Sequence, residues 1–197
     1  MTEITDLGVA DIRDGFRGGE FSAREVADAF NTAIDGADAL NCFIVKTPEK
    51  AVEAAEEADR ALASGDVAPL SGVPLGIKDL FCTNGVQSTA ASHILEGFVP
   101  PYESTVSGNL LAAGAGMLGK LNMDQFAMGS SNETSYFGDV ISPWRRNDGG
   151  NAPLSPGGSS GGTSAAIAAE VPPDDPPGES GALPPSLRRQ GETTSPK

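Results

Sequence analysis

The residue composition changes abruptly near position 170, and this change limits how much of the chain can fold. The last 26 residues contain 7 of the 15 prolines and only three larger aliphatic-type residues, Ala182, Leu183 and Leu187. Such a segment cannot bury enough apolar surface to offset the entropy of ordering its backbone. We therefore expect one folded domain over residues 1–170, followed by a disordered, proline-rich tail over residues 171–197.

Helix signals are clear in the first third of the chain. Residues 5–17 carry apolar positions at helical spacing and end at a pair of glycines. The next helix, expected over residues 22–34, begins with a capping box in which Ser22 and Glu25 each accept a free backbone N–H of the helix start. Thr47 is expected to cap a third helix, which would end at glycine 65.

Short apolar runs lie between these helices and further ones. They are typical of buried strands and occupy residues 41–46, 73–82 and 116–122. Helices are expected over residues 103–115 and again from residue 163. The alternation of helices with short buried strands predicts an α/β fold.

The chain is strongly acidic, with a net charge of −14. Residues 1–170 hold 23 acidic against 10 basic residues. This surface would repel phosphate backbones and anionic lipids, so we expect no direct nucleic-acid binding and no membrane association. It is typical of proteins from a high-salt cytoplasm, where salt screens the self-repulsion.

The remaining compositional signals also favour a cytoplasmic protein. Cys42 and Cys82 are too few and too isolated for a disulfide framework, and we expect two reduced thiols. The acidic N-terminus lacks the apolar segment of a signal peptide. No run of apolar residues approaches the ~20 that a membrane helix needs. No metal-binding pattern is recognised.

The stretch "SPGGSSGGTSAAIAAE", residues 155–170, is the most unusual local feature. A flexible linker is disfavoured because the run is brief and leads directly into an alanine-rich helix. A phosphate-binding loop would need lysine where Thr163 stands. A nucleophile elbow would need a histidine further along the chain, but the one histidine, His93, lies upstream and is expected to be a surface or structural residue.

Lys78 is a candidate base because it stands in the apolar run "GVPLGIKDLFC". Burial disfavours the charged form of lysine, and a neutral amine could take a proton from a serine hydroxyl. Two alternatives remain open from the local sequence, an ion pair with Asp79 and a partly exposed surface lysine.

Three segments together resemble the amidase signature family. They read "PLSGVPLGIKDLFCTNGVQSTAAS", "GKLNMDQFAMGSSNETSYFG" and "PGGSSGGTSAAIAA". The resemblance implies an α/β fold with a mixed sheet flanked by helices, of which this chain would hold an incomplete N-terminal part. It also implies amide hydrolysis by a Ser–cis-Ser–Lys triad.

Two segments, "ILEGFVPPYESTV" and "NMDQFAMGSSNETSYFG", are most similar to one branch of that family. Its members are the glutaminase subunits of tRNA-dependent amidotransferases. The resemblance implies that glutamine is hydrolysed and that its ammonia converts a mischarged Glu-tRNA(Gln) to Gln-tRNA(Gln). The corresponding synthesis of Asn-tRNA(Asn) remains an open alternative. A partner subunit would bind the tRNA and use ATP and Mg²⁺, and this chain would bind no cofactor of its own.

The resemblance also assigns roles to particular residues. Lys78 matches the base, and Ser159 matches the bridging serine whose peptide bond is cis in the family. Met128, Gly129, Ser130 and Ser131 match a loop that lines the substrate pocket. The alternative for these four is a plain surface loop.

The family's nucleophilic serine has no match in this chain. It lies 24 residues after the bridging serine in a "TGGS" segment, and that count falls on Leu183. Ser180 and Ser186 are nearby, but their proline-rich surroundings do not match. We therefore expect a truncated, inactive protein whose residues from about 171 are translated out of frame or come from a degenerate copy. The missing strands would leave unpaired sheet edges and exposed apolar surface, which favours aggregation.

Two other functions remain compatible with the sequence. One is a fragment of a general amidase that hydrolyses other carboxylic amides. The other is a non-catalytic interaction subunit that keeps only the N-terminal helices.

Overall fold

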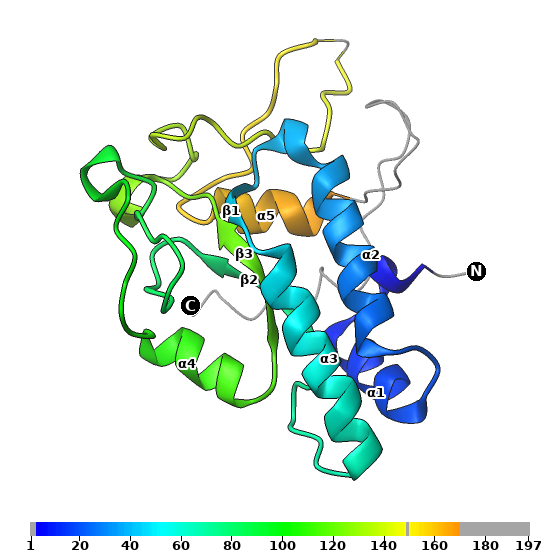
Figure 1. The fold of residues 1–197 in the computed structure, drawn as a ribbon. Helices are drawn as coiled ribbons and strands as arrows, with labels where there is room; N and C mark the ends of the chain where they lie inside the picture. Colours follow the sequence, from blue (N-terminus) through cyan, green and yellow to red (C-terminus); the bar gives the residue numbers. More distant parts are fainter. Residues whose placement is uncertain (1–2, 149, 170–197) are drawn as a thin grey trace, which may run out of the picture.

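The computed structural model describes residues 3–148 and 150–169 (Figure 1). The expected disorder of the tail, residues 171–197, falls outside this part of the chain. In chain order, the described elements are η1 (Ile4–Asp6), α1 (Val9–Gly18), α2 (Ala23–Gly36), η2 (Asp38–Leu40), β1 (Phe43–Lys46), α3 (Pro48–Ser64), β2 (Pro74–Lys78), η3 (His93–Leu95), α4 (Thr105–Ala112), β3 (Gly116–Leu121), η4 (Gln125–Ala127) and α5 (Gly161–Ala168).

The three strands form one mixed sheet in the order β1-β3-β2. β3 is the central strand and is buried at every residue. It pairs antiparallel with β1 and parallel with β2, and the second pairing places Lys78 opposite Leu121. The predicted α/β class and the mixed sheet are both confirmed.

Alanine-rich helix faces cover the sheet. α2 and α3 pack side by side, and α3 lies against β3 (Figure 1). The core between them holds Phe16 and Leu118 together with alanines of both helices, among them Ala27 and Ala55. Small side chains at these positions let the helix axes approach each other closely, which suits a chain with few aromatic residues.

Close packing also fixes the start of α5. A side chain at Gly162 would meet the main-chain atoms of Cys42 and Asn122. Glycine at this position therefore lets the first turn of α5 reach the ends of β1 and β3. This approach brings the glycine-serine stretch to the edge of the sheet where β2 also ends.

Most predicted elements are present, with three corrections. The capping box of Ser22 and Glu25 is confirmed. Thr47 occupies the N-cap position of α3, but its hydroxyl donates to the Met117 carbonyl (3.0 Å), so the predicted capping bond is wrong. Residues 5–17 form a short 3-10 turn and a separate helix rather than one helix. α5 begins at Gly161, two residues before its expected start.

The two cysteines differ in burial, since Cys42 is buried and Cys82 is partly exposed. Cys42 and Cys82 are both free thiols, as predicted. Cys42 is buried, and burial raises the pKa of its thiol to about 12. Across the described ranges, no helix is both long enough and apolar enough to cross a membrane.

Candidate active site

Lys78 occupies the last position of β2, at the end of the sheet that faces α5. The preceding residue, Ile77, is buried in the core, so the alternation of a strand turns Lys78 to the other face. Its side chain is half-buried. The strand therefore delivers an amine to a partly enclosed edge of the fold.

Two serine hydroxyls meet this amine. Lys78 Nζ donates to Ser159 Oγ at 2.8 Å and to Ser160 Oγ at 2.7 Å. The peptide bond between Gly158 and Ser159 is cis. Ser160 is the N-cap residue of α5, yet its side chain makes no capping bond, so its hydroxyl points to the lysine instead. The sequence interpretation assigned Ser159 to the relay and considered Ser160 only as the serine of a nucleophile elbow, so it missed the contact between Ser160 and Lys78.

The surroundings of Lys78 favour its neutral form. Burial lowers the pKa of the amine, and the nearby carboxylate of Asp124 acts in the opposite direction. A neutral amine within hydrogen-bonding distance of a serine hydroxyl can accept its proton. The cluster therefore has the geometry of a base and its proton donor.

Asp124 is a second residue that the sequence interpretation missed. It is fully buried, and its carboxylate accepts hydrogen bonds from the backbone N–H of Asn132 (3.1 Å) and the Thr134 hydroxyl (2.9 Å). Its own backbone N–H donates to the Ser159 carbonyl at 3.0 Å. Asp124 therefore holds the backbone of the serine pair and also lies near the amine.

The loop of residues 128–131 lies beside the serine pair, as the resemblance would require of a pocket loop. A side chain at Gly158 would come within 2.8 Å of the main chain of Ser130 and Ser131. The carbonyl of Ser131 accepts a hydrogen bond from Ser155 Oγ at 2.6 Å. Met128, Gly129 and Ser130 are exposed, and the Met128 side chain is 75% exposed. Each remains a candidate pocket residue.

Asp79 and His93 both lie away from the cluster of Lys78 with its two serines. The alternative in which Lys78 pairs with Asp79 is wrong, because Asp79 pairs with Lys120. His93 is exposed and stacks on Tyr136 with ring centroids 4.6 Å apart, which confirms its placement at the surface. Position 183, where the family's spacing would place the nucleophile and this chain has Leu183, lies outside the described residues.

A separate apolar cavity of about 450 Å³ lies between the sheet, α2 and α5. Neither Lys78 nor Ser159 lines it. Its lining includes the apolar side chains of Leu7, Ile34, Phe43, Leu75, Leu121 and Ile167. Within residues 3–148 and 150–169, no three His, Cys, Asp or Glu side chains are grouped as metal ligands would be.

Comparison with known proteins extends these observations. The sequence model of the family described as Amidase matches residues 25–173. A curated relative from Rhizorhabdus wittichii, named as the A subunit of glutamyl-tRNA(Gln) amidotransferase, is 75% identical over 160 residues, which are 81% of this chain and 32% of the relative. The chain thus spans about a third of the length of the curated relatives it matches.

Solved structures share the same fold. One, described as a vestigial protein complex that reveals the evolutionary origins of an s-triazine catabolic enzyme, superimposes with a TM-score of 0.73 at 35% identity. The match covers 82% of this chain and 35% of the chain in that structure. The native peptide amidase from Stenotrophomonas maltophilia gives a TM-score of 0.72 at 30% identity, covering 83% and 34% of the two chains.

Proposed function

The chain belongs to the amidase family, and from that premise we propose that residues 1–169 are the N-terminal part of the glutaminase subunit of a tRNA-dependent amidotransferase. The names of the curated relatives support this choice within the family. The complete subunit would hydrolyse glutamine and supply ammonia for the conversion of Glu-tRNA(Gln) to Gln-tRNA(Gln). The enzyme is then a carbon–nitrogen ligase with glutamine as its amido donor.

The other parts of the reaction would belong to a partner subunit. That subunit would hold the tRNA and use ATP and Mg²⁺ to activate the glutamyl group. The net charge of −14 supports this division, because an acidic surface is unfavourable for binding a polyanion. A cytoplasmic location follows from the proposal, because tRNA is charged in that compartment.

The contact between Lys78 and Ser159 is the observation that carries the proposal. In its neutral form, Lys78 would accept the proton of Ser159, and Ser159 would accept the proton of a nucleophilic hydroxyl. Such a relay activates a hydroxyl without an imidazole. The lowered pKa of Lys78 supports this role, since it increases the fraction of neutral amine at a given pH.

The loop of residues 128–131 would form one wall of the glutamine pocket. Its position beside Gly158 supports this role, since a substrate carbonyl must lie within reach of both the relay and the loop. Three of its four residues, Met128, Gly129 and Ser130, are exposed and could therefore contact a small polar substrate.

The proposal is tested most simply in a chimera. Residues 1–169 of this chain would replace the matching segment of the Rhizorhabdus wittichii relative, coexpressed with the other subunits of that amidotransferase. We expect the chimera to release ammonia from glutamine. Lys78→Ala should reduce this rate by ~10²–10⁴-fold, the usual contribution of general acid–base catalysis.

A matched control uses another lysine of the same chain. Lys50 is exposed on α3, so Lys50→Ala should leave the glutaminase rate unchanged. A folded chimera without glutaminase activity would overturn the proposal, as would a Lys78→Ala chimera with full activity.

The 197-residue chain by itself provides the complementary test. We expect no ammonia release from glutamine, because the residue at the nucleophile's expected place is Leu183. Glutamine hydrolysis by this chain that Lys78→Ala abolishes would contradict that expectation.

A further inference from the structure

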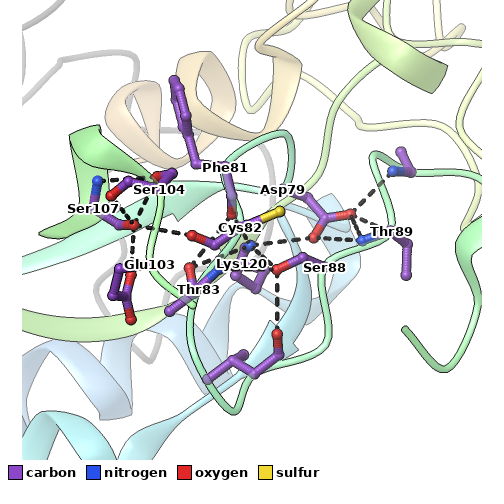
Figure 2. Close-up of polar contacts among 12 residues, drawn as sticks. Asp79, Phe81, Cys82, Thr83, Ser88, Thr89, Glu103, Ser104, Ser107 and Lys120 are labelled. Carbon is purple, nitrogen blue, oxygen red and sulfur yellow. Dashed lines mark hydrogen bonds and ion pairs between the residues drawn. The ribbon is translucent and has the colours of Figure 1, made fainter. Parts of the chain in front are cut away.

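A buried ion pair includes Asp79, the residue that directly follows Lys78 (Figure 2). Lys120 of β3 and Asp79, the residue after Lys78, are both completely buried, with Nζ and Oδ1 3.7 Å apart. Burying two charges is costly, and a pair of apolar side chains of similar volume is often equally stable. Stability alone therefore does not explain the pair, and the other hydrogen bonds of its two side chains indicate its role.

Lys120 bonds three residues of the segment that follows β2. Its ammonium group donates to the Phe81 carbonyl (2.5 Å), to Ser88 Oγ (2.6 Å) and, more weakly, to Thr83 Oγ1 (3.4 Å). All three acceptors belong to residues 79–92, the segment that begins immediately after Lys78 (Figure 2). One buried ammonium group thus bonds three residues of a loop that contains no helix or strand between β2 and η3.

Asp79 fastens the second half of the same segment. Its carboxylate accepts from the Thr89 amide (3.0 Å), the Thr89 hydroxyl (2.6 Å) and the Ala91 amide (3.0 Å). These bonds fold the segment back onto its own beginning (Figure 2). Ala90 and Ala91 are held with φ of 50° and 54°, left-handed conformations that residues other than glycine adopt at a cost.

The folded-back segment in turn supports the candidate pocket loop. The Phe126 amide donates to the Ala90 carbonyl (2.9 Å), and the Tyr136 amide donates to the Ala91 carbonyl (3.0 Å). Gln125 Nε2 donates to Ser92 Oγ at 2.7 Å. Residues 90–92 are therefore bonded to both ends of the stretch that includes residues 128–131.

The ion pair also keeps Asp79 away from its sequence neighbour. The Asp79 carboxylate is occupied by Lys120, Thr89 and Ala91, and Lys78 is left with its serine partners. Each lysine thus has a different carboxylate nearby. Asp79 pairs with Lys120, whereas Asp124 is the carboxylate that acts on the pKa of Lys78.

We propose that Lys120 and Asp79 are positioning residues, whose buried pair clamps residues 79–92 and thereby fixes the Lys78 amine and the loop of residues 128–131 relative to Ser159. The proposal rests on the proposed function only in treating Lys78 as the base. The geometric claim concerns the 197-residue chain itself and is tested without any turnover.

The test measures the reactivity of the Lys78 amine as a function of pH. Trace acetylation with acetic anhydride, followed by mass spectrometry of the Lys78 and Lys50 peptides, gives the midpoint at which each amine becomes neutral. Lys120→Met should let water and the freed Asp79 carboxylate reach Lys78. Both changes favour the charged amine, so the Lys78 midpoint should rise by at least about half a pH unit towards its ordinary value.

A milder pair of variants keeps the test decisive if Lys120→Met does not fold. Thr89→Val removes the 2.6 Å hydroxyl bond to Asp79, whereas Thr89→Ser retains a hydroxyl in the same place. We expect Thr89→Val to raise the Lys78 midpoint and Thr89→Ser to leave it unchanged. Lys50→Met, a substitution on an exposed face of α3, is the surface control and should also leave it unchanged.

The outcomes separate this proposal from the proposed function. An unchanged Lys78 midpoint in folded Thr89→Val, or in folded Lys120→Met, would overturn the clamp. A raised midpoint in this chain together with an inactive chimera would support the clamp and overturn the glutaminase assignment.

Discussion

Lys78 and Lys120 lie on neighbouring strands, and burial lowers the pKa of both, but their surroundings differ. Lys78 ends β2 at a half-buried position and contacts two serine hydroxyls. Lys120 lies within the central strand, has no exposed surface and is paired with a carboxylate. Only the first amine can exchange a proton with a hydroxyl near which a substrate could bind.

The comparison shows that a lowered lysine pKa does not by itself identify a base. Burial acts on both amines, and the partners decide the outcome. Both amines contact hydroxyl groups, but Lys120 is also paired with the Asp79 carboxylate and a main-chain carbonyl, which can only hold the ammonium in place. No carboxylate is bonded to Lys78, whose hydroxyl partners can give up a proton. The two lysines thus divide into a proposed base and a proposed positioning residue.

Loss of the Lys120 charge should have the largest effect on stability. We predict that Lys120→Met lowers the free energy of unfolding by ~3–5 kcal/mol, because it leaves the buried Asp79 carboxylate without its counter-charge. Lys78→Met should lower the same quantity by only ~1–2 kcal/mol, since it removes two hydrogen bonds to serine hydroxyls but leaves no buried carboxylate without its counter-charge. Urea unfolding monitored by circular dichroism measures both. Equal losses for the two variants would remove the distinction between the lysines.

Removing both members of the pair should be less damaging than the single changes suggest. In a double-mutant cycle of Asp79→Asn and Lys120→Met, we predict a coupling energy of ~1–3 kcal/mol, because the double variant contains no unpaired charge. The measurement is again urea unfolding of the two single variants and the double variant. Strictly additive losses would show that the two side chains act independently.

The serine partners of Lys78 should matter less for stability. Ser159→Ala and Ser160→Ala each remove one hydrogen bond at a half-buried site, and each should cost ~0.5–1.5 kcal/mol. The two costs should be similar because the two contacts are of similar length. Thermal unfolding of both variants measures these costs. A loss of unfolding free energy as large as that of Lys120→Met would show that the serines stabilise the fold as strongly as the buried ion pair does.

The smallest expected effect is a pH dependence of stability. The folded chain lowers the pKa of Lys78 from its ordinary 10.5, so between these two pKa values the unfolded chain binds more protons. Wild-type stability should therefore rise with pH through this window, relative to Lys78→Met. Unfolding of both proteins at pH 7 and pH 10 gives the comparison. If the unfolding free energy of the wild type minus that of Lys78→Met stays constant or falls with pH, the Lys78 amine is not desolvated in the folded state.

The sequence was most informative where the chemistry is local. The run around Lys78 and the glycine-serine stretch around Ser159 could each be recognised from consecutive residues, and the structure brings them together across 81 positions. The capping box at Ser22 and the buried β3 strand were predictable for the same reason.

Contacts between distant segments could not be predicted in this way. Asp79 stands beside Lys78, and local sequence left their ion pair open, but the strand pairing brings Lys120 to Asp79 instead. Asp124 joins the site through the backbone of Ser159, which no spacing rule reveals. Thr47 occupies the predicted N-cap position of α3, but its hydroxyl donates to the carbonyl of Met117 on β3 instead of capping the helix.

The proton affinity of Lys78 in the 197-residue chain is the most direct test of the division between the two lysines. Trace acetylation between pH 7 and pH 11 compares it with the exposed Lys50 in the same sample. We predict that Lys78 becomes neutral at a lower pH than Lys50, because the serine pair and the sheet edge desolvate it. Equal midpoints for the two amines, in a chain that is folded by circular dichroism, would contradict the assignment of Lys78 as the base.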